Sequence, residues 1–427
     1  MYIGWVDSIM PTPGISPDTC TITAQAWNSR AALSEVSIPV QEDVTYDAVL
    51  DKILETTRVY PPTEATVWFL GVVGQSELGQ TTQLGSTATF SSFEAGISTF
   101  TFAGDNWSDS TTIYGAFQDT VGREYGRCWQ ARDGVLNAIN RHALISDKTV
   151  DFTFTNTMSN MEYQYGNSED IANKVSLKAQ TRRETAAQVV AGLQQAVSIT
   201  AGSTVDIIYV IESQDSGVSL AVKNPITPVA TTDYLVNAAA DGSGTNLTGS
   251  CTGAIVAGES FATRVTIRYS LSGSTSGYIT FGQVRGTKLD NFAVVERTAQ
   301  DDTSIGAYGK RQFTWPYSVD SISTADSLVD FILLERKSPR GRVKNISFKP
   351  QTSAALLSGA LRNSIFARIA VTETQTGLSS EPYFIIGENH AFAEQDYSVS
   401  WELESTSSTD FWVLGTNTLG SSYLGPL

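Results

Sequence analysis

Hydrophobic and polar residues alternate along most of this chain, with the period of two that is typical of β-strands with one buried face. The alternation is clearest at residues 150–154, 265–271 and 399–403, where apolar residues occupy every second position. Residues 205–211 also predict a strand, because they are rich in β-branched side chains. Successive side chains of a strand point to opposite faces, so these segments predict sheets whose polar side meets water or a partner.

Apolar residues at helical spacing occur in two stretches. The first spans residues 45–54, with Thr45 as a suitable N-cap and Asp47 well placed in the first turn. Its apolar stripe consists of Tyr46, Val49, Leu50, Ile53 and Leu54. Residues 184–199 are ambiguous, since their Ala and Gln content favours a helix, but the strand that follows leads us to predict strand there too.

The second helical stretch begins at Ser323, and Asp326 follows three residues later as the acid of a capping box. Its apolar face carries Leu328, Val329, Ile332 and Leu333. Pro339 and Gly341 end the helix. We expect both helices to cover sheets, and this one to seal a β-barrel of the last domain.

Chain length and turn signals indicate several domains. A chain of 427 residues can form two to four domains that each bury a core. Turn residues are dense at 215–286, which predicts a compact β-sandwich module. Residues 75–92 and 404–422 are rich in Ser, Thr and Gly and predict exposed loops, the second a flexible tail. The expected fold is mainly β, with several β-barrel or β-sandwich domains and a few covering helices as α+β additions.

The charge balance disfavours nucleic acid as a specific ligand. The chain carries 28 Lys and Arg against 44 Asp and Glu, a net charge of −16. A protein that binds a DNA duplex needs clustered cations to displace counterions from the phosphates. The densest basic stretch, residues 336–349, contains Lys337, Arg340, Arg342 and Lys344. It fits either a solvated basic loop or a phosphate site.

Cysteine usage and hydropathy give no sign of secretion or of a membrane. Cys20, Cys128 and Cys251 are odd in number and far apart, so we expect three reduced, packed cysteines rather than a disulfide framework or a zinc site. The N-terminus has neither the basic segment nor the long apolar segment of a secretory signal. The longest apolar run, residues 67–73, is too short to cross a bilayer, so we expect no stable membrane insertion.

Residues suited to catalysis are few. The chain has two histidines, His142 and His390, and neither has the second histidine that a metalloprotease helix needs at the fourth position along. The Gly-x-Ser-x-Gly turn of serine hydrolases and the phosphate-binding Walker A loop are both missing from the sequence. We therefore predict no catalytic residue, no metal ligand and no cofactor, and that the chain is not an enzyme.

Two further kinds of residue are site candidates: oxygen ligands for calcium and tryptophans that could bind sugars. Oxygen ligands that could suit calcium occur close together but fit a Gly/Asp turn better: Asp105, Asn106, Asp109, Asp241 and Asn246. Three tryptophans could stack on sugars, although core packing is the commoner role: Trp107, Trp129 and Trp412. A glycosidase needs only two carboxylates at a suitable separation, which a sequence cannot measure.

Several runs, taken in order, resemble the tail-hub and tail-tip proteins of tailed bacteriophages. They are MYIGWVDSI with the later AVLDKILE, VGREYGRCWQARDGVLNAINRH, YQYGNSEDIANKVSL, DDTSIGAYGKRQF, and TGLSSEPYFIIGENHAF followed by SVSWELE. In the second run the matching residues are Gly126, Arg127, Asp133, Gly134, Asn140 and Arg141. Together the runs cover most of the chain.

The resemblance implies a structural protein of the phage tail tip or baseplate, in the virion, assembled in the host bacterial cytoplasm. It implies a closed hub ring, a homotrimer, that joins the tail tube to tip proteins and lets DNA pass. Partners would be tube, distal tail, tip or fibre proteins. The implied domains are a hub-like β-barrel region with an α/β addition at 1–165, a continuation with an inserted module at 166–298, and a hub-like β-barrel at 299–427. A carbohydrate-binding tail adhesin and a cell-wall hydrolase are the alternatives.

Overall fold

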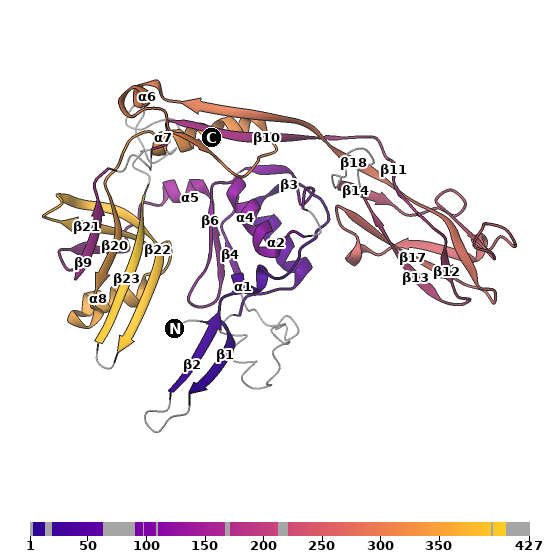
Figure 1. The fold of residues 1–427 in the computed structure, drawn as a ribbon, viewed down its shortest axis with the longest axis horizontal. Helices are drawn as coiled ribbons and strands as arrows, with labels where there is room; N and C mark the ends of the chain where they lie inside the picture. The colour runs from indigo at the N-terminus through magenta and orange to yellow at the C-terminus, as the bar shows by residue number, and fades with distance from the viewer. Residues whose placement is uncertain are drawn as a thin grey trace.

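The structure is a computed structural model that describes residues 3–12, 19–62, 90–96, 98–107, 110–166, 171–211, 221–393 and 396–406. The chain is mainly β with helices that cover its sheets, as the sequence predicts. The sheets among these residues are open, so none of them confirms a β-barrel. Figure 1 shows a central module, a C-terminal sheet beside it, and a long strand pair that leads to a distal sandwich.

In the described part of the chain, the central module packs three helices against two small sheets around one apolar core. Its helices are α1 (Trp27–Ala31), α2 (Tyr46–Thr57) and α4 (Ile113–Arg123). Its strands are β3 (Gln41–Thr45), β4 (Ser91–Phe93), β5 (Thr99–Ala103), β6 (Arg127–Gln130) and β7 (Leu136–Ile139). The predicted first helix is confirmed as α2, and its apolar stripe is buried. Thr45 stands at the N-cap position, but its side chain makes no capping hydrogen bond.

A two-stranded hairpin projects from the central module (Figure 1). It consists of β1 (Trp5–Thr12) and β2 (Thr19–Gln25), paired antiparallel with Ile9 opposite Ile22. Both residues are 62% exposed, although apolar side chains of that size are usually covered. An isolated hairpin is marginally stable in water, so this one relies on its attachment to the module.

Two long strands form an arm across the molecule (Figure 1). β10 (Lys174–Glu184) runs antiparallel to β18 (Gly277–Gln300), and β19 (Gln312–Thr314) pairs with β10 in parallel. Two helices follow β18 along the chain, α6 (Asp302–Tyr308) and α7 (Ile322–Arg336). The apolar face of α7 packs on β10 and β18, with Leu328 and Ile332 fully buried.

The predicted second helix is therefore confirmed as α7, with two corrections. It begins at Ile322, one residue early, with Ser321 at the N-cap position. Asp326 is not a capping acid, because both its carboxylate oxygens accept hydrogen bonds from Arg297 of β18. The helix covers the sheet of the arm instead of sealing a barrel of the last domain.

The distal sandwich lies at the far end of the arm and has two facing sheets. Strands that pair with β18 are β11 (Gln188–Gly192), β12 (Val197–Ile199), β14 (Ala221–Ile226) and β15 (Tyr234–Asn237). The second sheet contains β13 (Thr204–Val210), β17 (Arg264–Leu271) and β16 (Cys251–Ile255), and two 3-10 turns adjoin it, η4 (Thr248–Ser250) and η5 (Ala257–Glu259). Both sheets contribute to one core, which confirms the predicted sandwich and the strands predicted at 184–199.

The C-terminal sheet has six strands and one covering helix. Its order is β8 (Phe152–Thr155), β21 (Arg368–Glu373), β22 (Leu378–Ala393), β23 (Asp396–Ser405), β20 (Arg342–Phe348) and β9 (Asn160–Gln164). The short α5 (Arg141–Ser146) leads into it, and η6 (Pro350–Thr352) and α8 (Ala354–Arg362) follow β20. The predicted alternation at 399–403 is confirmed, because Val399, Trp401 and Leu403 are all buried.

Sheets join segments that were predicted as separate domains. β8 and β9, from 1–165, lie in one sheet with four strands from 299–427. The boundaries 1–165, 166–298 and 299–427 stay a prediction. The distal sandwich is inserted where β10 and β18 end their pairing, at Glu184 opposite Leu289, so residues 290–298 of β18 belong to the arm.

The predictions about the loops and the cysteines have mixed outcomes. Residues 75–89 and 407–422 of the predicted loops lie outside the described residues, whereas Ser91 belongs to β4 and Glu404 to β23. The three cysteines are free, but Cys20 is exposed and so is not packed as expected. No helix among the described ranges is long and apolar enough to cross a membrane.

Candidate functional site

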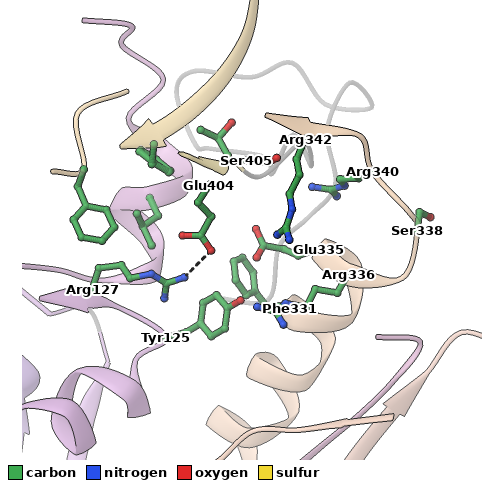
Figure 2. Close-up of a pocket in the computed structure, with 14 residues that line it drawn as sticks. Tyr125, Arg127, Phe331, Glu335, Arg336, Ser338, Arg340, Arg342, Glu404 and Ser405 are labelled. Carbon is green, nitrogen blue, oxygen red and sulfur yellow. Dashed lines mark hydrogen bonds and ion pairs between the residues drawn. The ribbon is translucent and has the colours of Figure 1, made fainter. Parts of the chain in front are cut away.

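A cavity of about 180 Å³ lies where the central module, the arm and the C-terminal sheet meet. Figure 2 shows side chains from β6, the end of α7, the start of β20 and the end of β23 that point toward it. Apolar side chains line part of it: Leu144, Phe331, Phe366 and Phe384. The other lining residues are polar or charged: Tyr125, Arg127, Glu335, Arg336, Ser338, Arg340, Arg342, Glu404, Ser405 and Thr406.

Arginine dominates the charge of the cavity. Four arginine side chains line it against two glutamate side chains, although the whole chain carries a net charge of −16. Arg127 Nη2 lies 3.4 Å from Glu404 Oε1 (Figure 2). The Arg336 guanidinium lies over the ring of Phe313, 4.8 Å from its centroid, which fits a cation–π contact.

Tyr125 lines the cavity with its aromatic ring, between β6 and α7. Its ring packs against Trp315 and Phe331, with centroids 4.8 and 5.4 Å away. Burial raises the pKa of the Tyr125 hydroxyl, and the nearby Glu335 adds to the rise. The hydroxyl therefore keeps its proton at neutral pH and can donate a hydrogen bond.

The basic stretch at 336–349 divides between the two roles predicted for it. Arg340 and Arg342 line the cavity, as does Arg336 at the start of the stretch. Lys337 instead pairs with Asp301, at 3.1 Å. Lys344 is not among the residues that line the cavity. Sequence spacing alone did not distinguish these positions.

An arginine that does not line the cavity joins the central module to the C-terminal sheet by hydrogen bonds. Arg132, on the turn between β6 and β7, donates to both carboxylate oxygens of Glu388, with an Nε–Oε1 distance of 2.8 Å. The same guanidinium donates to the carbonyl oxygens at the end of α8, namely those of Ala360, Leu361 and Asn363. Neither residue of the ion pair was singled out from the sequence.

Both histidines have structural surroundings. His390 Nε2 lies 3.1 Å from Arg132 Nη2, and its Nδ1 lies 2.7 Å from the hydroxyl of Tyr397. Burial and Arg132 lower the pKa of His390. Burial and Arg141 lower the pKa of His142 to about 4. The described part of the chain holds no group of three or more His, Cys, Asp or Glu that could bind a metal ion.

The matching residues of the second resemblance run are mostly structural. Arg141 forms an ion pair with Glu124 at 3.0 Å, and both side chains are almost fully buried. Burial raises the pKa of Glu124 and lowers that of Arg141, and each residue opposes the shift of the other, so the ion pair offsets part of the cost of burying both charges. Asn140 caps α5 by accepting from two backbone amides, and Gly134 adopts a φ of 90° in the β6–β7 turn.

Asn173 joins two other runs of the resemblance. The Asn173 side chain donates to the carbonyl oxygen of Gly309 at 2.7 Å and accepts from the amide of Arg311 at 2.7 Å. Its amide also lies 3.3 Å from the Ser304 hydroxyl. Asn173 is fully buried, so these bonds satisfy a polar group that would otherwise be costly to bury.

The oxygen-rich positions act in turns and ion pairs. Asp105 accepts from Arg182 at 2.5 Å, and Asn106 accepts from Arg123. Asp241 and Asn246 accept from backbone amides two residues further on, as the turn interpretation predicts. The remaining position, Asp109, lies outside the described residues.

The tryptophans do not form a sugar platform in the described chain. Trp107 is buried, and its indole nitrogen donates to Asp119 at 3.2 Å. Trp129 packs against Phe366, with ring centroids 4.5 Å apart. Trp412 lies outside the described residues.

No family model matches the chain, and no curated protein matches it. Two solved structures are similar in fold. The prophage MuSo2 43 kDa tail protein from Shewanella oneidensis is 9% identical, with a TM-score of 0.45, and the match covers 95% of this chain and 80% of that one. A tail protein from Neisseria meningitidis MC58 is 8% identical, with a TM-score of 0.46 and the same coverage. Likenesses at this level are too distant to carry an argument about function.

Proposed function

We propose that this chain is a non-catalytic structural subunit of a bacteriophage tail, which forms a closed hub ring in the tail tip or baseplate. The observation that carries the proposal is that the runs resembling hub proteins are held together in pairs by polar contacts. Asn173 joins the run at 163–177 to the run at 301–313. Arg132 joins the run at 121–142 to the run that contains Glu388 and His390.

These contacts hold modules in place, which is the task of a scaffold. Many of them end on backbone amides and carbonyls, and they connect turns and helix ends far apart in the chain. An enzyme would instead gather a nucleophile, a base and an orienting group around a cleft. Functions that reside in interfaces require a rigid arrangement of surfaces, so we assign the recurring motifs to that role.

The β1–β2 hairpin supports self-association as a closed homotrimer. It exposes four apolar side chains at its surface: Val6, Ile9, Met10 and Ile22. Asp7 is the one charged residue among the described residues of the two strands. The hairpin carries almost no charge, so it can pack on a second copy of a chain of net charge −16 without adding repulsion. Cyclic symmetry then limits growth, since contacts that do not close would form filaments.

Mass photometry of the hairpin variant Ile9→Asp/Ile22→Asp tests this contact. We expect the trimer to dissociate to monomers, because two carboxylates would enter an apolar interface. The matched control is Val229→Asp, which changes a residue that is 51% exposed in the distal sandwich and should leave the trimer intact. A monomeric wild-type chain in assembled tails, seen by electron microscopy, would contradict the ring.

Salt gives a second test of the ring. Each copy carries a charge of −16, and part of that charge is proposed to face a channel whose acidic wall repels passing DNA. Repulsion between subunits is screened beyond about 8 Å at physiological ionic strength. The ring should therefore dissociate more readily at low salt. A channel lined mainly by Lys and Arg would overturn the acidic conduit.

Two assays distinguish the alternatives. Saturable binding of the isolated chain on a glycan array would favour the carbohydrate-binding adhesin. Clearing of host cell wall in a zymogram would favour the hydrolase, for which Glu335 and Glu404 are the two carboxylates that line the cavity. Loss of such clearing in Glu335→Gln would assign the reaction to that pair.

A further inference from the structure

The cavity at the meeting point of the three modules has the chemistry of an anion site. Its four arginine side chains exceed its two glutamate side chains by two positive charges, within a chain that is strongly acidic overall. Three of the arginines come from the single short segment that ends α7 and begins β20 (Figure 2). A local excess of cations raises the concentration of anions near it.

The other lining groups suit an oxyanion. Tyr125, Ser338 and Ser405 supply hydroxyl groups to the lining, whereas the Thr406 hydroxyl donates to the carbonyl oxygen of Pro382 at 3.3 Å. Burial raises the pKa of Tyr125, so its hydroxyl is a donor throughout the neutral range. Guanidinium groups match the planar geometry of carboxylate and phosphate oxygens and bind them through paired hydrogen bonds. Phe331, Phe366 and Phe384 form an apolar wall beside these donors, and a lower local polarity strengthens charge-assisted bonds.

The size of the cavity limits the ligand to a compact group. Its volume of about 180 Å³ exceeds the roughly 10–15 Å³ that a cavity needs to hold one water, so a small anion fits with some water. We propose that this cavity binds a compact oxyanion, a phosphate or carboxylate group, through Arg336, Arg340 and Arg342. Such a group bridges α7 of the arm to β20 and β23 of the C-terminal sheet, so it also stiffens their junction.

Isothermal titration of the full chain with two probes tests the site. Inorganic phosphate and succinate are titrated separately, with sodium chloride added to hold the ionic strength constant. Binding of phosphate alone assigns a phosphate group as the ligand, and binding of succinate alone assigns a carboxylate, such as an acidic side chain of a neighbouring subunit. Binding of both supports the shared oxyanion chemistry. Failure of both probes to bind overturns the proposal.

Three variants locate the binding. Arg340→Gln removes one lining cation and should weaken binding by at least about tenfold, the effect of losing a charge-assisted hydrogen bond. Arg340→Lys keeps the charge without the paired geometry, so its affinity should lie in between. Lys344→Gln is the matched control, because it removes a charge from β20 outside the cavity.

Equal loss of affinity in Arg340→Gln and Lys344→Gln would overturn the proposal, since it would reflect general surface charge. The melting temperature of each variant without ligand shows that it is folded. The titration uses the isolated chain, so its result is independent of whether the chain assembles into a tail.

Discussion

Arg132 and Glu388 form an ion pair across the junction of the central module and the C-terminal sheet, although 256 positions separate them in the chain. The side chains are 21% and 15% exposed, so water screens the pair only in part. The same guanidinium binds carbonyls at the end of α8, where the helix dipole favours a positive charge. One side chain thus joins a turn, a strand and a helix.

Removing this arginine should loosen the junction. Arg132→Ala leaves Glu388 and the carbonyl oxygens of α8 partly buried without their donor. We expect a loss of about 1–3 kcal/mol in the free energy of unfolding, below the roughly 3–5 kcal/mol for a fully buried pair because both side chains are partly exposed. Urea denaturation measures the loss, and hydrogen exchange should show faster opening at β22.

A surface pair provides the control for that prediction. Lys349 and Asp396 lie 2.9 Å apart, but about half of each side chain is exposed. Lys349→Ala should therefore change stability little. Equal destabilisation by Arg132→Ala and Lys349→Ala would show that the junction does not depend on the Arg132 network.

Truncation of the buried face of α7 should destabilise the arm. Leu328 and Ile332 are fully buried against β10 and β18, so replacing either by Ala should cost about 2–5 kcal/mol, since it removes apolar contacts and leaves a cavity. Ile322, at the start of the same helix, is 41% exposed, and its replacement by Ala should have much less effect. The melting temperatures of the three variants, measured by thermal denaturation, distinguish the buried sites from the exposed one. Unchanged stability in both buried-site variants would show that α7 is not a core element.

Two glycines from the resemblance runs should respond in opposite directions to alanine. At Gly126 a Cβ would collide with the backbone carbonyl of Ile139, so Gly126→Ala should destabilise the fold by about 1–3 kcal/mol. At Gly306, inside α6, a Cβ meets no atom within 4 Å. Gly306→Ala should gain about 0.5–1 kcal/mol from reduced backbone freedom in the unfolded chain. Urea midpoints of the two variants on the same side of the wild type would refute this assignment.

Stability should fall as the pH drops from 7 toward 5. The pKa values of His142 and His390 are lowered in the fold, His142 to about 4. The unfolded chain takes up protons near the ordinary histidine pKa of about 6.5, before the folded chain does, so acid favours unfolding. Glu388 acts at lower pH: burial opposes its ionisation, but Arg132 outweighs this and lowers its pKa. Its contribution is present above the ordinary glutamate pKa and is lost as the pH falls through the folded value.

The variant His142→Gln tests the histidine part of that prediction. It removes one titrating group without changing the Arg132 network, so the decline in urea midpoint between pH 7 and pH 5 should be shallower than in the wild type. Equal slopes for both proteins would mean that His142 does not contribute to the pH dependence.

Local pattern determined the elements with a regular period of buried side chains, whereas α4 and α8 were not predicted from it. The stripe of α2 and the alternation in β23 could be predicted because burial of one face requires a period set by backbone geometry. The role of Asp326 could not be predicted in this way. Its position in α7 matches a capping box, but Arg297 of β18 offers two charged hydrogen bonds, which are stronger than one bond to a backbone amide.

The sequence by itself determined a mainly β chain, several of its strands, two of its helices and the runs that resemble hub proteins. Only the tertiary structure decided which of those runs meet, and which arginines of the stretch at 336–349 share a cavity with Arg127. The physical reason is that periodicity reports the burial of one face, which neighbouring residues determine among themselves. The pairing of Arg132 with Glu388 depends instead on how whole sheets pack, and no local pattern encodes a partner 256 positions away.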